Sequence, residues 1–202
     1  THLVTGTGSA YTVNNGIDLS GEGGLVWLKN RSSSGYNHTL YDTERSGTLF
    51  SDATNAASDY ASEIASYNSN GFTTVSSGAT YNNVNNIDYV SWTWRKAPKF
   101  FDIVTYTGNG SNQNISHNLG SVPGMIIVKD RSEGSSWSVF HRSMTNSDVI
   151  YLNSTSAKAT EVDWNNTDPT SSVFTVGNSS SVNKSGNNYV AYLFAHNNND
   201  GG

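Results

Sequence analysis

Acidic residues are the first candidates for chemistry in this sequence. Hydrolysis of a glycosidic bond needs two carboxyl groups that face one cleft. Asp163 precedes Trp164, whose ring could stack on a sugar. The acidic residues considered for such a pair are Asp42, Glu44, Asp59, Glu63, Glu161 and Asp163. They are sparse and lie in polar segments, which favours solvated surface charges over a catalytic pair.

Nucleophilic and metal chemistry have weaker support. The sequence has no G-x-S-x-G motif, and Gly108-Asn109-Gly110-Ser111 resembles one only superficially. It has no cysteine, no H-E-x-x-H motif and no acidic loop with calcium spacing. The five histidines are dispersed: His2, His38, His117, His141 and His196. We predict that the protein is not an enzyme and has no catalytic residue, metal site or cofactor. A calcium ion held by scattered Asp side chains and loop carbonyls stays an open alternative.

Two pairs of basic residues and a few aromatic residues are candidates for binding. Lys29 and Arg31, like Lys129 and Arg131, follow apolar runs. We expect these pairs at strand ends in solvent, where they oppose edge aggregation; the alternative is contact with acidic sugars or phosphate. Aromatic residues in or beside polar loops could stack on glycans, anchor a subunit interface or belong to the core. They are Tyr36, His38, Trp137 and Trp164.

Composition excludes several classes of protein. The chain has 202 residues, a formal net charge of −5 and only 13% charged residues. It contains no run of Lys and Arg, so the basic footprint of a nucleic-acid-binding protein is missing. No long apolar run or basic amphipathic stretch predicts membrane insertion. Abundant Asn, Ser, Thr and Gly lower the helix propensity and favour turns and polar strand faces.

The chain repeats itself at a shift of 100 residues. The segment 24–32 matches 124–132, and 89–92 matches 189–192. Residues 3–8 match 103–108 at the same shift, and near residue 71 the register slips by two. It recovers before Val84-Asn85, which we align with Val182-Asn183. We infer a tandem duplication with copies at 1–97 and 98–202. Matched positions are mostly apolar or turn-forming, so the duplication concerns packing and not an active site.

Short apolar or alternating segments predict the strands. Residues 25–28 and 125–128 are apolar runs typical of buried strands. Residues 89–94 alternate, and we expect Val90, Trp92 and Trp94 to face the core, as Val190, Tyr192 and Phe194 do in the second copy. Residues 101–105 and 137–141 also have the period of a strand. The Ala-rich segment 53–65 predicts one short helix in the first copy.

These patterns define the expected fold class. Short strands, separated by Gly-, Asn- and Ser-rich turns, predict an all-β protein. The fold is expected to consist of two tandem, similar β-sandwich domains of a jelly-roll-like type. Residues 96–99 form the short linker between them.

The second copy resembles a known kind of module. The segments 101–110, 115–129, 173–177 and 189–195 are similar to a module in tail-fibre and related virion proteins of marine and cyanobacterial phages. The first copy is similar more loosely, through Trp92–Lys96. The resemblance implies an extracellular place on a virion, other virion subunits as partners, and homo-oligomerisation, with a trimer along a fibre axis. It implies no site residues.

The expected function follows from this resemblance. We expect a structural virion component of a tail fibre or appendage, whose exposed loops contact a host-surface polysaccharide. One alternative is a capsid or tail decoration protein that stabilises the particle. Another, from a different class, is a fragment of a carbohydrate-active enzyme such as a polysaccharide depolymerase.

Overall fold

The computed structural model describes residues 1–57, 60–75 and 81–196. The chain forms two compact units. Unit 1 contains Thr1–Ala53 and Ala57–Arg95, and unit 2 contains Thr54–Ala56 and the described residues from Lys96 onward. Both units are built from antiparallel sheets, which confirms the predicted all-β fold class.

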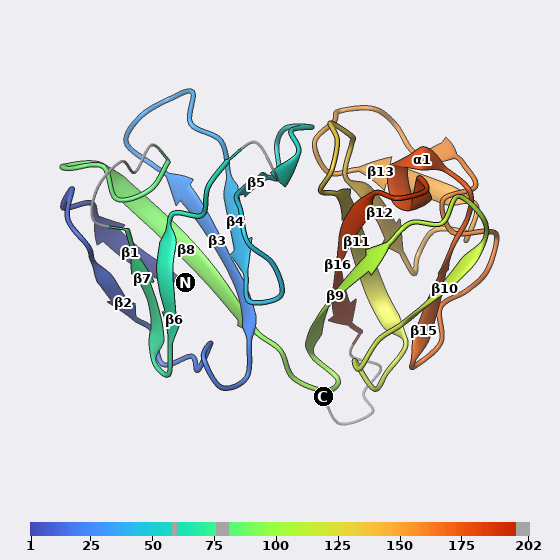
Figure 1. Ribbon diagram of the computed structural model, residues 1–202, viewed down its shortest axis with the longest axis horizontal. Coiled ribbons are helices and arrows are strands. Elements are labelled where there is room, and N and C mark those ends of the chain that lie inside the picture. Colours follow the sequence, from blue (N-terminus) through green and yellow to red (C-terminus); the bar gives the residue numbers. More distant parts are fainter. Residues whose placement is uncertain (58–59, 76–80, 197–202) are drawn as a thin grey trace. The chain divides into compact units, whose positions relative to one another are not determined.

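Unit 1 is a sandwich of a larger and a smaller sheet (Figure 1). The larger sheet has the order β1 (His2–Thr5), β8 (Asp88–Arg95), β3 (Gly24–Asn30), β4 (Thr39–Asp42) and β5 (Leu49–Phe50). The smaller sheet has the order β2 (Thr12–Asn14), β7 (Gly71–Thr74) and β6 (Ile64–Asn68). Apolar residues of both sheets close the core: Val13, Val26, Leu28, Tyr41, Ile64 and Phe72, with Leu19 from a loop. Burial of these side chains supplies the main stabilisation of the unit.

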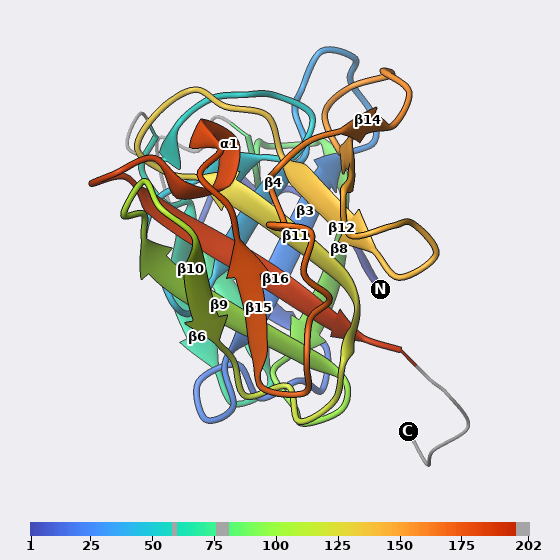
Figure 2. The ribbon, with the colours of Figure 1, turned by 90° about the vertical axis from the view of Figure 1, so that its right-hand side faces the viewer.

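Unit 2 repeats this plan with a different second sheet. The larger sheet has the order β14 (Ala159–Thr160), β13 (Asp148–Tyr151), β12 (Ser138–His141), β11 (Pro123–Asp130), β16 (Asn188–Ala195) and β9 (Phe101–Thr107). The smaller sheet contains only β10 (Gln113–Ser116) and β15 (Val173–Val176), which lie over the larger sheet in Figure 2. The core between them includes Ile115, Ile126, Val128, Phe140, Trp164, Phe174 and Leu193.

The register of the central strands shows the duplication directly. In unit 1 Leu25 pairs with Trp94, and in unit 2 Met125 pairs with Phe194. These pairs differ by 100 residues on both strands. The shift changes at the first strand, because Leu3 pairs with Val90 whereas Thr105 pairs with Val190. Leu3 is therefore equivalent to Thr105, and the predicted alignment of residues 3–8 with 103–108 is wrong by two residues.

The predicted core face of the last strand is also wrong. Val26 and Leu28 lie in the core and pair with Thr93 and Ser91, so these two residues, and not Trp92, share the core face of β8. In unit 2 the core contains Tyr189, Ala191 and Leu193. Alternation alone could not decide this, because it separates the two faces of a strand without showing which of them the second sheet covers. Val90, Trp92 and Trp94 lie on the face opposite the core. Val190 and Tyr192 lie on the corresponding face of β16, but both are fully buried, so for them the expectation of burial is confirmed.

The described part of the segment 53–65 contains no α-helix; Ala57 has a 3₁₀ conformation, and β6 begins at Ile64. Ser, Asn and Asp between the alanines offer the backbone competing hydrogen bonds. Among the described residues one α-helix occurs, α1 (Ser180–Asn183), a single turn capped by the Ser179 side chain. In the described ranges, no helix has the length and apolar character needed to cross a membrane.

Candidate functional site

Three indole rings gather on the larger sheet of unit 1, on the face opposite the core. Trp27 and Trp92 are direct cross-strand partners on β3 and β8. Their ring centroids lie 6.4 Å apart in an edge-to-face arrangement, and Trp94 lies 6.2 Å from Trp27. With His38 these rings line a cavity of about 270 Å³. All four side chains are half-buried, so each ring presents part of its surface to the cavity. We call Trp27, His38, Trp92 and Trp94 the aromatic site.

His38 holds the Trp27 ring in place. The Trp27 Nε1–H donates to His38 Nδ1 at 3.0 Å, and the His38 backbone N–H donates to Asp52 Oδ1 at 3.1 Å. Burial lowers the pKa of His38; nearby Asp52 opposes the shift and Lys29 adds to it. The neutral imidazole is therefore favoured, and only a neutral ring can accept the indole hydrogen bond at Nδ1.

The four aromatic candidates of the sequence take different positions. His38 belongs to the aromatic site, whereas Trp164 is 2% exposed and lies in the core of unit 2. Trp137 is buried and occupies the position in unit 2 that is equivalent to His38. Its backbone N–H donates to Asn153 Oδ1 at 2.8 Å, as the backbone N–H of His38 donates to Asp52 Oδ1. Tyr36 is half-exposed and its carbonyl accepts from Lys29 Nζ.

Sequence reasoning missed the three tryptophans of the aromatic site. It placed Trp27 in a buried run and assigned Trp92 and Trp94 to the core. The available signal was the uneven distribution of large rings on β8. Trp92 and Trp94 share one face of this strand, and the small residues Ser91 and Thr93 share the other. A two-layer sandwich buries only one face of each sheet between its layers, so the face with the tryptophans can lie outside the core.

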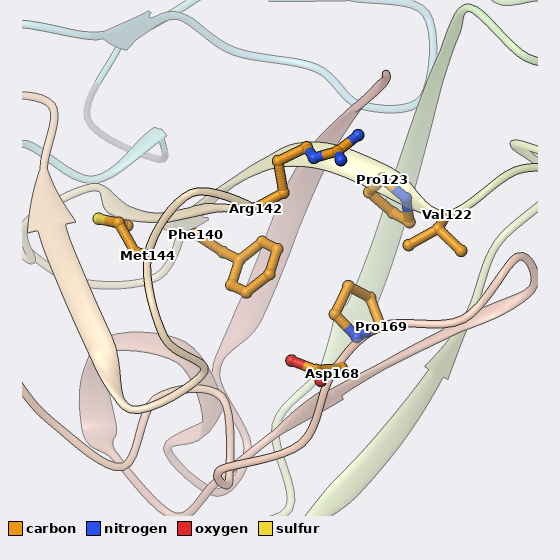
Figure 3. A pocket seen from close by; sticks show the side chains of 7 residues that line it. All are labelled: Val122, Pro123, Phe140, Arg142, Met144, Asp168 and Pro169. Carbon is orange, nitrogen blue, oxygen red and sulfur yellow. The ribbon is translucent and has the colours of Figure 1, made fainter. Parts of the chain in front are cut away.

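Unit 2 has a different cavity of about 400 Å³. Figure 3 shows Phe140 in the middle of the view, with Pro123 and Pro169 across from it. The cavity is lined by Val122, Pro123, Phe140, Arg142, Met144, Asp168 and Pro169. Arg142 and Asp168 are exposed, and Val122 is 49% exposed. The cavity therefore joins an apolar base to a cation and an anion. No local motif in the sequence indicates it, because its residues come from three separate segments.

Three of the acidic candidates are buried, which contradicts the expectation of solvated charges. Asp42 forms an ion pair with Arg45 at 2.8 Å, and both side chains are fully buried. Glu63 accepts hydrogen bonds from the backbone N–H groups of Tyr81 and Asn82. Asp163 accepts from Ser138 Oγ at 2.7 Å. Buried carboxylates persist where such donors replace water.

Glu63 and Asp163 are equivalent residues of the two units. Their carbonyls accept from the N–H groups of Val75 and Gly177, at 3.0 and 2.8 Å. Each carboxylate satisfies donors of its own sandwich, a structural role that explains its burial. Glu44 and Glu161 are exposed, and Asp59 lies outside the described residues.

The histidines and carboxylates form no metal site in the described part of the chain. There, no group of three or more His, Asp or Glu side chains is arranged to hold an ion. His117 is buried and stacks on Phe174, with centroids 6.4 Å apart. His2, His141 and His196 lie on other elements or at their ends.

The basic pairs differ between the units. Lys129 is fully buried, and its ammonium group donates to the carbonyls of Asp130 at 2.6 Å and Thr54 at 3.2 Å. The expectation that Lys129 lies in solvent is wrong. Its side chain leaves β11 on the face opposite the core, and there backbone carbonyls take the place of water as partners of the ammonium group. Lys29 is half-buried, Arg31 is exposed and Arg131 is half-buried.

Comparison with protein families gives one match, which runs over residues 1–199. The match covers residues of both units. Comparisons with curated proteins and with solved structures returned no match. The chain belongs to the family described as "Domain of unknown function (DUF7483)".

Proposed function

We propose that the protein is a structural component of a virion tail fibre or appendage and that its aromatic site binds a host-surface glycan. The observation that carries the glycan-binding part is the arrangement of Trp27, Trp92 and Trp94 around a cavity of about 270 Å³. Indole rings offer flat apolar surfaces that pack on the C–H faces of a pyranose. Shallow, largely preformed cavities of aromatic side chains are typical ligand sites.

The virion setting is supported by the resemblance of the second copy to phage tail-fibre modules. A net charge of −5 and sheets that bury apolar residues in a core suit a protein that must stay soluble outside a cell. Under this proposal the partners are other virion subunits and further copies of the chain, assembled as a trimer along a fibre axis.

The environment of the acidic residues supports a binding function over hydrolysis. Glu63 and Asp163 belong to different units, and each accepts hydrogen bonds inside its own sandwich. A glycosidase needs two carboxyl groups beside one bound sugar. The aromatic site contains no carboxylate among its lining residues.

A glycan array tests the proposal on the full chain. We expect the wild-type protein to bind a subset of neutral bacterial surface oligosaccharides. Trp92→Leu should weaken this binding at least about tenfold, or 1.4 kcal/mol, because it removes one stacking surface. The matched control is Phe100→Ala, which removes an exposed ring (49% exposed) outside the aromatic site.

Each rival function gives a different result. A decoration protein predicts no glycan binding by the wild type. A depolymerase predicts new reducing ends when the protein is incubated with host polysaccharide, and their loss in Glu63→Gln or Asp163→Asn. Binding that survives Trp92→Leu unchanged would remove the aromatic site from the proposal.

A further inference from the structure

The cavity of unit 2 lies in a region where the two copies of the fold differ. Phe140 is equivalent to Tyr41, because Ile126 pairs with Phe140 as Val26 pairs with Tyr41. In unit 1 the strand β6 passes this region, and the Tyr67 hydroxyl donates to the Asp42 carbonyl at the end of β4, at 2.8 Å. Tyr67 packs against the core there. The Tyr67 side chain therefore occupies this place in unit 1.

The sequence explains why unit 2 lacks this strand. Ile64 and Trp164 are core residues that directly follow the equivalent pair Glu63 and Asp163. After Trp164 the chain turns through Asn165 and Asn166, whose φ angles are 51° and 49°. Asparagine tolerates this left-handed conformation, but a strand does not include it. Pro169 then lacks the N–H that a paired strand would donate.

The loss of the strand opens the space beside Phe140. The second sheet of unit 2 therefore has two strands, and residues 165–172 cross as a loop. That loop places Asp168 and Pro169 on one side of the cavity, and the turn after β12 places Arg142 and Met144 on the other (Figure 3). Unit 1 has the strand β6 with Tyr67 in this region, so the loop that lines the cavity is particular to unit 2.

The chemistry of the lining selects a ligand class. Phe140, Pro123 and Pro169 provide apolar rings, as sugar-binding surfaces do. The guanidinium of Arg142 matches a carboxylate by two parallel hydrogen bonds. Asp168 accepts from Asn146 Nδ2 through Oδ1 at 3.2 Å, and a carboxylate has further lone pairs for ligand hydroxyls. A volume of about 400 Å³ lies within the usual range of ligand sites.

We propose that this cavity binds an acidic saccharide residue, with Arg142 on its carboxylate, Asp168 on its hydroxyls and Phe140 against its apolar face. The inference rests on the proposed function, since it adds a second glycan site on the same chain. The two sites differ in chemistry: the aromatic site has no charged lining residue, whereas this cavity has a cation that a neutral sugar does not need.

Saturation-transfer NMR on the full chain tests this proposal, with galacturonate trimer as the probe and neutral galactose trimer for comparison. We expect the wild type to bind the uronate in preference to the neutral sugar. Arg142→Met should weaken uronate binding at least tenfold and remove the preference. Arg142→Lys, which keeps the charge without the planar fork, should lose less. Trp92→Leu should leave uronate binding unchanged.

The outcomes separate this site from the aromatic site. If the wild type binds the uronate no better than the neutral sugar, or if Arg142→Met binds as the wild type does, the acidic-sugar site is wrong. If Trp92→Leu abolishes uronate binding, both ligands use the aromatic site and this proposal also fails. If Trp92→Leu loses binding of the neutral glycan and keeps binding of the uronate, the proposed function and the second site both stand. Unfolding midpoints of all variants, measured in parallel, identify any loss caused by misfolding.

Discussion

Asn83 and Asn183 perform the same task in the two units, although 100 residues separate them. The Oδ1 atom of each accepts a backbone N–H at 2.9 Å, from Thr7 in unit 1 and from Asn109 in unit 2. Each Nδ2 donates to the carbonyl of a serine, Ser9 or Ser111. Each asparagine therefore ties the loop before the last strand to the loop after the first.

Removal of the Asn183 amide should destabilise unit 2. Asn183 is fully buried, and Asn183→Ala leaves the Asn109 N–H and the carbonyls of Ser111 and Gly177 without this partner. We expect a loss of about 2–4 kcal/mol in the free energy of unfolding, measured with urea. Asn112→Ala, at an exposed position in the same loop, is the control and should change stability by less than about 0.5 kcal/mol. Equal effects of the two substitutions would contradict the proposed tie.

Gly108 should tolerate no side chain, for a reason that differs from that at Gly186. A Cβ at Gly108 would collide with the Lys184 carbonyl, whereas one at Gly186 would meet nothing within 4 Å. Gly186 has a φ of 84°, so Gly186→Ala carries conformational strain of about 1–2 kcal/mol. Gly108→Ala should cost about 3 kcal/mol or more, because the backbone must move. Chemical denaturation of both variants checks the order, and a smaller cost at Gly108 would be evidence against the close approach.

Much of the strand pattern could be predicted from the sequence. The apolar runs at 25–28 and 125–128 form β3 and β11, and residues 89–94 lie within β8. The equivalence of the two copies is visible in the sequence because their central strands keep a constant shift. The shift changes where loops differ in length. For this reason the sequence alignment paired Asn85 with Asn183, whereas the structure shows that Asn83 is the residue equivalent to Asn183.

The candidate sites were harder to predict, for physical reasons. Trp92 and Ser91 are neighbours on β8, and only the partner strand decides which of them faces the core. The small side chains of Ser91 and Thr93 make room in unit 1 for larger core residues on β3, so the tryptophans occupy the opposite face. The unit 2 cavity depends on the path of the loop after Trp164, which no period in the sequence encodes.

Trp164 should contribute its apolar ring to stability more than its indole N–H. The side chain is 2% exposed and packs edge-to-face on Phe140, with centroids 5.8 Å apart. Within the described residues, its Nε1 atom has no hydrogen-bond partner. Trp164→Ala should therefore cost about 3–5 kcal/mol through the cavity it leaves. Trp164→Phe, which keeps an aromatic ring and removes an unpaired N–H, should cost only about 1–2 kcal/mol. Thermal unfolding followed by circular dichroism measures both, and similar losses would mean that the indole N–H matters.

The stability of unit 1 should fall on mild acidification because of His38. Burial lowers the pKa of this histidine below its ordinary value of about 6.5 in the unfolded chain. Just below that value the unfolded state binds more protons than the folded state. The stabilisation is thus fully present above about pH 6.5 and is lost as the pH falls through the folded pKa. Protonation also removes the acceptor of the Trp27 hydrogen bond, so glycan binding at the aromatic site should weaken in the same range.

A comparison of the wild type with His38→Gln isolates this contribution. His117 is also buried with a lowered pKa, so the wild type alone would report both histidines. The variant keeps an amide oxygen near Trp27 but cannot titrate, and the charges that act on position 38, Asp52 and Lys29, are unchanged. We expect the unfolding free energy of the variant to fall less steeply than that of the wild type between pH 7 and pH 5. The difference between the two slopes should correspond to at most about one bound proton. Identical pH profiles for the two proteins would show that His38 titrates alike in the folded and unfolded chains, and that the aromatic site is not sensitive to acid through this residue.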